Sequence, residues 1–199
     1  MKKSKRAKKS RTWVIKQHRD QFFKKAKVLG YRSRAAFKLL ELNKKFNFIK
    51  KNSNLLDIGS TPGGWSQVSS KIITSGKILA VDTKQMEKVE NVIFFKNNFL
   101  EKETQMKILK TFDAKIDVII SDMAENTTGN KSIDSIRTNN LCSTVINFSL
   151  KILNEKGTLI CKLFMGEDFL EVKNLAKNNF KKVDFFKPES SRSESKETY

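Results

Sequence analysis

The sequence predicts an α/β domain in which helices cover both faces of a mostly parallel sheet. Short apolar runs, each the length of a strand, alternate with longer segments that suit helices. These runs are nearly continuous, which is typical of strands that are buried on both faces. A glycine-rich stretch follows the first run, at the position where such domains bind ligands. The 199 residues suit one domain of this kind.

The expected elements follow from these runs. Strands are expected at 54–58, 77–82, 92–95, 116–121, 158–164 and 183–186. Helices are expected at 33–47, 64–74, 101–112, 134–153 and 168–179. Apolar residues of the first helix lie roughly on one face, namely Ala36, Phe37, Leu40 and Phe46. Ser33 is the expected N-cap of that helix.

Positive charge is concentrated in the first quarter of the chain. The formal net charge is +19, and residues 1–51 hold 19 Lys and Arg against two acids, Asp20 and Glu41. Such an excess is an electrostatic signature of nucleic-acid binding. We expect residues 1–20 to form a basic, flexible RNA-binding arm and residues 21–199 to form a single domain.

The composition argues against several classes of protein. No run approaches the roughly 18 apolar residues of a membrane helix, and no apolar segment follows the basic N-terminus as in a secretory signal. We therefore expect a cytoplasmic monomer that does not bind a membrane. Cys142 and Cys161 are expected to be buried, reduced thiols rather than a disulfide or a metal site. With His18 as the single histidine in the sequence, no metal site is expected.

The glycine-rich loop favours a nucleoside cofactor without phosphates. Asp57 lies near the end of the first strand, and Gly59 starts the loop. The dinucleotide fingerprint G-x-G-x-x-G has Thr61 at its middle position here, and Gly64 at its last. The missing glycine argues against an NAD-dependent oxidoreductase. Asp82 ends the second strand, 25 residues after Asp57, and this spacing suits a carboxylate that binds ribose hydroxyls.

For two residues of this loop region, a structural role is the alternative to ligand binding. Asp57 would then be a loop cap rather than a ligand-binding carboxylate. Trp65 would pack in the core, and the sequence supports this role and a contact with the ligand equally.

Charged residues end two of the later strands. Asp122 follows the fourth strand, and Lys162 ends the fifth within the apolar run TLICKLF. A charge in a strand that is buried on both faces needs a partner or a function. We expect Asp122 and Lys162 to meet at the rim of the sheet.

Several segments together resemble a known family. DIGSTPGGWSQ, SDMAENTTG, CKLFMGEDF and KPESSRSESKETY are similar, in this order, to motifs of the FtsJ/RrmJ ribosomal RNA 2′-O-methyltransferases. The likeness continues upstream through YRSRAAFKLLEL and covers nearly the whole chain. It implies a Rossmann-like fold and the cofactor S-adenosylmethionine. It also implies the reaction, which is 2′-O-methylation of a uridine ribose in the 23S ribosomal RNA of the large subunit. This methylation would support ribosome maturation.

The resemblance implies the residues of the site as well. The family's Lys-Asp-Lys-Glu tetrad matches Lys38, Asp122, Lys162 and Glu197. The expected cofactor-binding residues are Asp57, Gly59, Gly63, Gly64, Trp65, Asp82, Asn98 and Asp122. Two positions depart from the family. Asn98 stands where the family often has an aspartate near the adenine, and Glu125 replaces a proline.

The tetrad suggests a division of roles. Lys162 is the expected base, with Lys38 as a second positive charge, and Asp122 and Glu197 orient the two lysines. Lys162 acting only to steer the hydroxyl and stabilise its developing charge is an alternative. For the whole protein, the alternatives are a tRNA-directed relative and a non-catalytic RNA-binding protein. The intact tetrad disfavours the latter.

Overall fold

The structure is a computed structural model that describes residues 20–112, 115–125, 128–166 and 168–199. The expected arm, apart from Asp20, lies outside these described residues, and so does His18.

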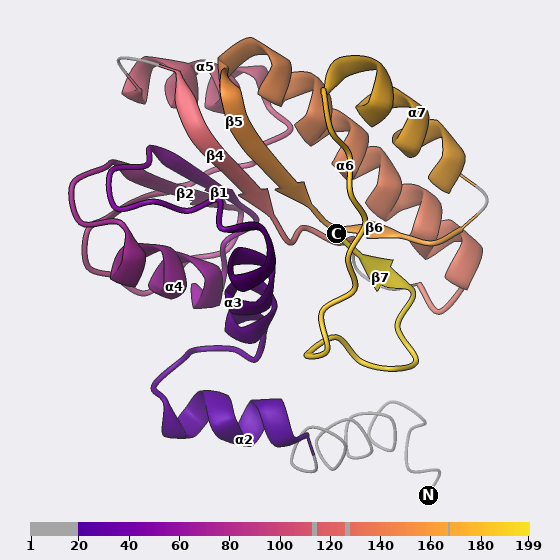
Figure 1. Cartoon of the computed structure of the whole chain (residues 1–199), viewed down its shortest axis with the longest axis horizontal. Coiled ribbons are helices and arrows are strands. Elements are labelled where there is room, and N and C mark those ends of the chain that lie inside the picture. The colour runs from indigo at the N-terminus through magenta and orange to yellow at the C-terminus, as the bar shows by residue number, and fades with distance from the viewer. Residues whose placement is uncertain (1–19, 113–114, 126–127, 167) are drawn as a thin grey trace, which may run out of the picture.

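A parallel five-stranded sheet forms the centre of the described domain, in the order β3-β2-β1-β4-β5 (Figure 1). Its strands are β1 Leu55–Ile58, β2 Ile78–Asp82, β3 Val92–Lys96, β4 Ile116–Ser121 and β5 Leu153–Cys161. The α/β class and the first four strands are therefore confirmed. After β3 at one edge, the chain returns to place β4 on the other side of β1. This change of direction creates the crevice at the carboxyl ends of β1 and β4 where such sheets bind ligands.

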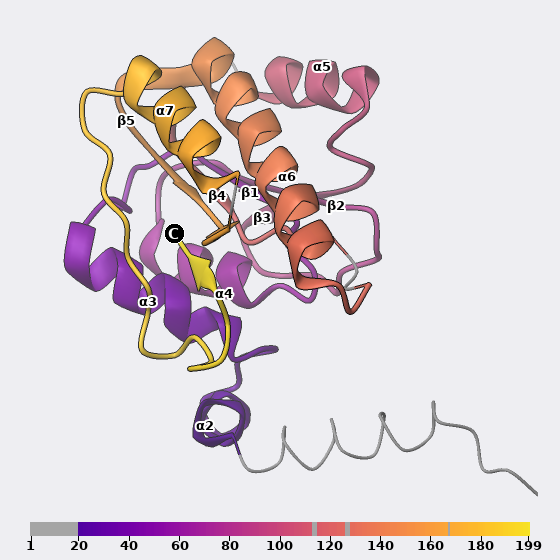
Figure 2. The ribbon, with the colours of Figure 1, turned by 90° about the vertical axis from the view of Figure 1, so that its right-hand side faces the viewer.

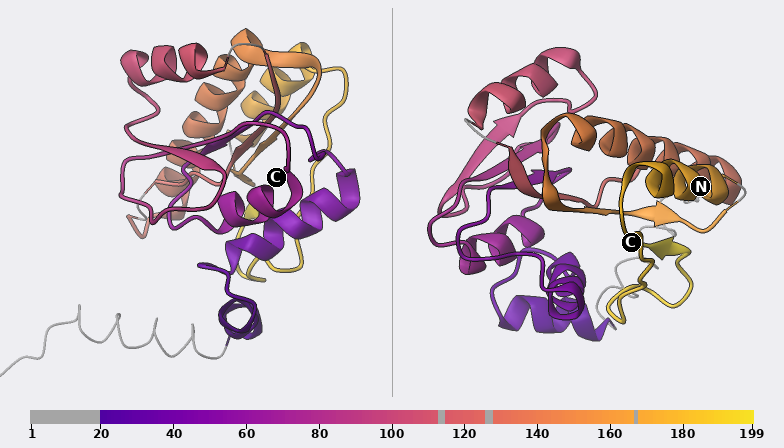
Figure 3. Two further views of the ribbon diagram at one scale, coloured as in Figure 1. Left: turned by 90° about the vertical axis from the view of Figure 1, so that its left-hand side faces the viewer. Right: turned by 45° about the horizontal axis from the view of Figure 1, so that its top comes forward.

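Helices cover the two faces of the sheet. They are α3 Ala35–Phe46, α4 Gly64–Ile72, α5 Lys102–Thr111, α6 Lys131–Ile152 and α7 Phe169–Asn179. A further helix, α2 Gln21–Val28, contacts α3 rather than the sheet. Successive residues of a strand point to opposite faces. Leu55 thus packs with α3 and α4, and Leu56 packs with α5 and α6. Figure 3 shows these two helical layers, with α7 beside α6.

The expected strand at 183–186 is wrong. The backbone of Phe186 exchanges two hydrogen bonds with Tyr199, at 2.8 and 2.9 Å, instead of joining the sheet. Lys182 and Asp184 form an exposed ion pair in the same segment. Because these residues do not pair with β5, β5 is the edge strand of the described sheet.

The expected strand at 158–164 is interrupted at Lys162. β5 ends at Cys161, and β6 (Leu163–Phe164) pairs antiparallel with β7 (Glu197–Thr198) in a separate small sheet. The Lys162 amide still donates to the Ser121 carbonyl of β4 at 2.9 Å. Lys162 therefore sits at the rim of the parallel sheet rather than inside a strand.

The expected start of the first helix is also wrong. Arg34, not Ser33, is the N-cap of α3, and no side chain caps this end. The Ser33 hydroxyl instead packs against Gly64, where a Cβ would lie 2.4 Å from its oxygen. The predicted apolar face is only partly right, because the buried residues of α3 are Ala36, Phe37, Lys38, Leu39 and Leu42.

The sequence did not predict α2, which begins at the boundary expected between arm and domain. Its N-cap is Asp20, whose carboxylate accepts hydrogen bonds from the Phe22 and Phe23 amides at 3.0 and 3.2 Å. Figure 2 shows α2 below the rest of the domain, and the C-terminal segment passing α3 on its way to β7. Within the described segments, no helix is long and apolar enough to cross a membrane.

Gly59 offers a test of the turn that follows β1. Its φ is +78°, and a Cβ there would lie 2.4 Å from Met123 Cγ, whereas Gly30 has a similar φ of +72° and open space around it. We expect Gly30→Ala to lower the free energy of unfolding by about 1 to 2 kcal/mol through backbone strain alone. Gly59→Ala should cost roughly 1 to 3 kcal/mol more through overpacking. Chemical denaturation of both variants measures the difference, and equal losses would contradict it.

Candidate active site

Three carboxylates gather at the carboxyl ends of neighbouring strands, as the sequence predicted. Asp57 lies within β1, Asp82 ends β2 and Asp122 directly follows β4. The carboxyl ends of parallel strands meet at one edge of the sheet, so these three residues lie near one another beside the glycine loop.

Asp82 ties the glycine loop to the end of β2. Its carboxylate accepts hydrogen bonds from the Thr61 amide at 2.9 Å and from the Lys84 amide at 2.8 Å. A carboxylate has about four acceptor sites, so it retains capacity for hydroxyl groups of a ligand. This arrangement fits the predicted role of Asp82 toward a ribose.

Asp57 is more deeply buried than expected of a cofactor contact. Its side chain points to the α4 face, where it accepts a 2.6 Å hydrogen bond from the Ser66 hydroxyl. Burial raises the pKa of Asp57 to about 7, the charges of Asp122 and Asp82 add to this, and the Ser66 hydrogen bond opposes it. This geometry favours a structural role, although Asp57 ties β1 to α4 through Ser66 rather than capping the loop. Its contact with the cofactor stays a prediction.

The four tetrad residues come together although they lie far apart in the sequence. Lys38 projects from α3, and its ammonium is 2.9 Å from the Glu197 carboxylate and 3.7 Å from that of Asp122. The Lys162 ammonium is 3.0 Å from the Asp122 carboxylate and donates to the Asp122 carbonyl at 2.6 Å. The expected partnership of Asp122 and Lys162 at the sheet rim is thus present.

Asp122 carries most of the electrostatic interactions of this cluster. Burial by itself would raise the pKa of Asp122, but the ammonium groups of Lys162 and Lys38 and the Tyr199 hydrogen bond outweigh it and hold the pKa below its ordinary value. Asp122 therefore stays ionised and fixes both lysines. Its side chain keeps 20% exposure, against 9% for Lys162 and 10% for Lys38, so the cluster is only narrowly open.

Tyr199 is a member of this cluster that the sequence analysis missed. Its hydroxyl donates to the Asp122 carboxylate at 2.6 Å and accepts from the Lys38 ammonium at 3.0 Å. Burial and the charges of Asp122 and Glu197 raise its pKa well above the ordinary value, which keeps the phenol neutral. The signal was available, because Tyr199 lies two residues after Glu197 and side chains at this spacing share one face of a strand.

Trp65 and Asn98 have other partners in the structure. The Trp65 side chain is buried in the core, where its ring lies 5.7 Å from that of Tyr199 and its indole N–H donates to the Ala35 carbonyl at 2.8 Å. This favours the packing alternative for its side chain. The Asn98 side-chain oxygen accepts from the Leu100 amide at 3.1 Å. A contact of either residue with the cofactor stays a prediction.

The glycine loop and its surroundings fit S-adenosylmethionine. Gly63 has φ +107°, and a Cβ there would lie 2.8 Å from Arg32 Nη1, so the loop needs glycine at this position. Among the described residues, the buried Ser60 hydroxyl has no hydrogen-bond partner. The first amides of α4 have no partners within the helix and suit a ligand carboxylate. These groups and Asp82 match the amino-acid and ribose parts of the cofactor.

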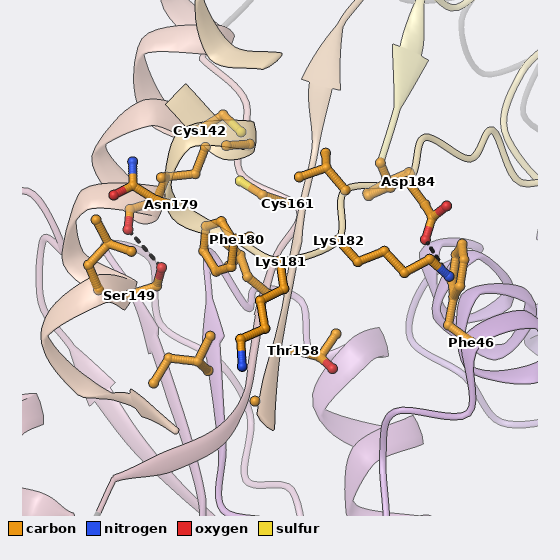
Figure 4. A pocket seen from close by; sticks show the side chains of 18 of the residues that line it. Phe46, Cys142, Ser149, Thr158, Cys161, Asn179, Phe180, Lys181, Lys182 and Asp184 are labelled. Atoms are coloured by element: carbon orange, nitrogen blue, oxygen red, sulfur yellow. Dashed lines mark hydrogen bonds and ion pairs between the residues drawn. The ribbon is translucent and has the colours of Figure 1, made fainter. Parts of the chain in front are cut away.

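A groove of about 770 Å³ runs along the open edge of β5, away from the glycine loop (Figure 4). Cys142 of α6 and Cys161 of β5 line it, and both are free thiols. Cys142 is buried as expected, whereas Cys161 is only partly buried. The tetrad residues Lys38, Asp122 and Lys162 do not line this groove. Across the described residues, no group of three or more His, Cys, Asp or Glu is arranged to hold a metal ion.

The buried carboxyl group of Asp57 makes stability depend on pH. The folded-state pKa of Asp57, about 7, exceeds the ordinary 3.8, so the folded protein binds the proton more tightly and loses stability as pH rises from about 4 to 7. Relative to Asp57→Asn, the free energy of unfolding should fall by roughly 2 to 3 kcal/mol between pH 5 and 8. Urea denaturation at several pH values measures this difference. Ser66→Ala should move the fall to higher pH, and a constant difference would exclude this titration.

Comparisons with known proteins agree with the geometry. The model of the FtsJ-like methyltransferase family matches residues 31–199. A Pelagibacter ubique protein named ribosomal RNA large subunit methyltransferase E is 44% identical over 190 residues, which is 96% of this chain and 94% of that protein. A Rickettsia bellii protein of the same name is 44% identical over 201 residues, or 98% of this chain and 88% of that protein.

A solved structure gives the same result. The crystal structure of a protein described as a ribosomal RNA methyltransferase from Plasmodium falciparum superposes with a TM-score of 0.75 and 35% identity. The match covers 84% of this chain and 94% of that one. The chain therefore belongs to the FtsJ-like methyltransferase family.

Proposed function

We propose that this protein transfers a methyl group from S-adenosylmethionine to the 2′-hydroxyl of a uridine ribose in 23S ribosomal RNA. The observation that carries the proposal is the pairing of Lys38 and Lys162 with one carboxylate, that of Asp122, next to the glycine loop. Relatives of similar length named as methyltransferases of large-subunit ribosomal RNA support the choice of substrate.

The cofactor residues are proposed from their placement around the crevice. Asp82 would bind the ribose hydroxyls of the cofactor, and the loop at Gly59, Gly63 and Gly64 would admit it close to the backbone. When bound, S-adenosylmethionine supplies a methyl group activated by a sulfonium. The protein must then align a ribose hydroxyl with that methyl group and manage the hydroxyl proton.

The tetrad residues are suited to the proton and to the charge on the oxygen. The Lys162 ammonium, which faces Asp122, must first release a proton to solvent, and the resulting amine then accepts the proton of the 2′-hydroxyl. The Lys38 ammonium stabilises the negative charge that develops on the oxygen. Asp122 holds both lysines in place, and Glu197 also pairs with Lys38. The same positions also suit a role in which Lys162 only steers the 2′-hydroxyl. Replacing Lys162 therefore tests whether the residue acts in the reaction at all.

The partner is proposed to be ribosomal RNA within the large subunit, bound in the cytoplasm by a monomer. The positive charge of residues 1–51 supports RNA binding, because each neutralised phosphate releases a counterion. The basic arm, residues 1–20, would make the first of these contacts.

A methylation assay on ribosomal subunits tests the proposal. Large subunits from cells that lack the protein are incubated with it and with methyl-labelled S-adenosylmethionine, and 2′-O-methyl groups are mapped by resistance to alkaline cleavage. We expect one newly methylated ribose in 23S RNA. Methylation of tRNA with none on the subunits would contradict the substrate, and failure to bind S-adenosylmethionine would contradict the reaction.

The Lys162→Ala variant tests the residue assignment in the same assay. Its single-turnover rate should fall by about 100- to 10,000-fold, because a positioned base or charge is worth this much. The matched control is Lys156→Ala, an exposed lysine on the same strand β5, which should keep the wild-type rate. A folded, cofactor-binding Lys162→Ala protein with the wild-type rate would refute the assignment.

A further inference from the structure

Three charged residues of α3 form a stripe on one side of this helix. Arg34, Lys38 and Glu41 are spaced so that their side chains follow one another along a helical face. All three contact the C-terminal segment, defined here as residues 187–198, which ends in β7. Lys38 is already part of the tetrad, whereas neither the sequence analysis nor the proposed mechanism uses Arg34 and Glu41.

Glu41 and Arg34 together hold both backbone groups of Ser190. The Glu41 carboxylate accepts hydrogen bonds from the Glu189 amide at 2.6 Å and from the Ser190 amide at 3.1 Å. The Arg34 guanidinium donates to the Ser190 carbonyl. Ser190 is fully buried, with 0% exposure. Hydrogen bonds to charged groups are about twice as strong as neutral ones, so this fastening is firm.

The same arginine connects the segment to the N-terminal helix. Arg34 forms an ion pair with Asp20, the N-cap of α2, and its guanidinium lies 5.7 Å from the Phe22 ring centre. Asp20 and Glu41 are the two acids among residues 1–51, a region with 19 basic residues. Both acids take part in this fastening. Asp20 pairs with Arg34, and Glu41 binds the segment directly.

The fastened segment carries Glu197 to the active site. Lys187 donates to the carbonyls of Ser193 and Ser195, at 3.2 and 2.6 Å, and so closes the loop between the fastening point and β7. Glu197 then meets Lys38 at 2.9 Å, one helical turn along α3 from Arg34. The position of Glu197 against Lys38 is thus set from α3 through the fastened segment, together with the pairing of β7 with β6.

We propose that Arg34 and Glu41 are positioning residues for methyl transfer, which hold the C-terminal segment on α3 and thereby place Glu197 against Lys38. The proposal rests on the proposed function for its catalytic consequence. The fastening itself is a property of the folded chain and is measured separately from activity.

Glu41→Ala is the principal variant, with Glu41→Gln as the conservative one. Glu41→Ala leaves the Glu189 and Ser190 amides without their acceptor, whereas glutamine keeps one acceptor oxygen. Glu90→Gln is the matched control, since Glu90 has an exposed side chain remote from this segment along the chain. Full-length proteins are compared below their melting temperatures, with active protein counted by binding of S-adenosylhomocysteine.

Two readouts are taken on each variant. Amide hydrogen exchange should become faster across residues 187–198 in Glu41→Ala and intermediate in Glu41→Gln. The kcat for methylation of large subunits should fall by about 10- to 100-fold in Glu41→Ala, the scale of a misplaced active-site group, with KM for the RNA and cofactor affinity unchanged. Glu41→Gln should recover part of kcat, and Glu90→Gln should match wild type in both readouts.

Two outcomes overturn the proposal. Unchanged exchange in Glu41→Ala means that Glu41 does not hold the segment. Faster exchange with an unchanged kcat means that the segment does not position the reacting groups. If wild-type protein methylates no ribosomal RNA, the proposed function fails, and the exchange measurement still decides whether the fastening exists. Arg34→Lys, which loses the forked geometry of the guanidinium, repeats both readouts where Glu41→Ala does not fold.

Discussion

The Asp122 carboxylate is the interaction on which the active site depends. Two lysine ammonium groups that are about nine-tenths buried, those of Lys38 and Lys162, both face it. Removing a charge from water costs several kcal/mol unless a partner of opposite charge compensates. Asp122 supplies that partner for both, Glu197 adds a second carboxylate beside Lys38, and the cluster balances two positive charges with two negative ones.

The fold explains how these groups meet. Asp122 and Lys162 leave the sheet at adjacent strand ends, because β4 and β5 are parallel neighbours. Lys38 comes from α3, which packs on the sheet face that carries the start of α4. Glu197 comes from the C-terminal segment, which is held along the same helix, and Tyr199 directly follows that segment. The crevice therefore joins four separate parts of the chain, and a change in any one of them alters the surroundings of Asp122.

The sequence was sufficient for the first four strands of the sheet and for the residues of the tetrad. Continuous apolar runs located β1 to β4, and the matched motifs identified Lys38, Asp122, Lys162 and Glu197, which the structure brings together. What the sequence missed depends on long-range backbone partners. The apolar run at 183–186 resembles a strand, but its partner is the backbone of Tyr199 rather than the sheet.

At two positions, tertiary packing overrides what the local sequence predicts. Ser33 has the chemistry of an N-cap, but its hydroxyl packs against Gly64 instead of capping α3. Trp65 follows the glycine loop directly, and its side chain nevertheless turns into the core. Glu41 looks like an ordinary helix-surface acid, and only the folded position of residues 189 and 190 gives it a role.

The Asp122→Asn variant tests the central claim most directly. The substitution keeps the shape of the side chain and removes the charge that holds both lysines. The measurement is the single-turnover rate of methyl transfer to large ribosomal subunits at saturating S-adenosylmethionine, on protein shown to be folded. The account predicts a rate about 100- to 10,000-fold below wild type, because the charges around the reacting oxygen lose their common anchor. A folded Asp122→Asn protein that transfers the methyl group as fast as wild type would contradict it.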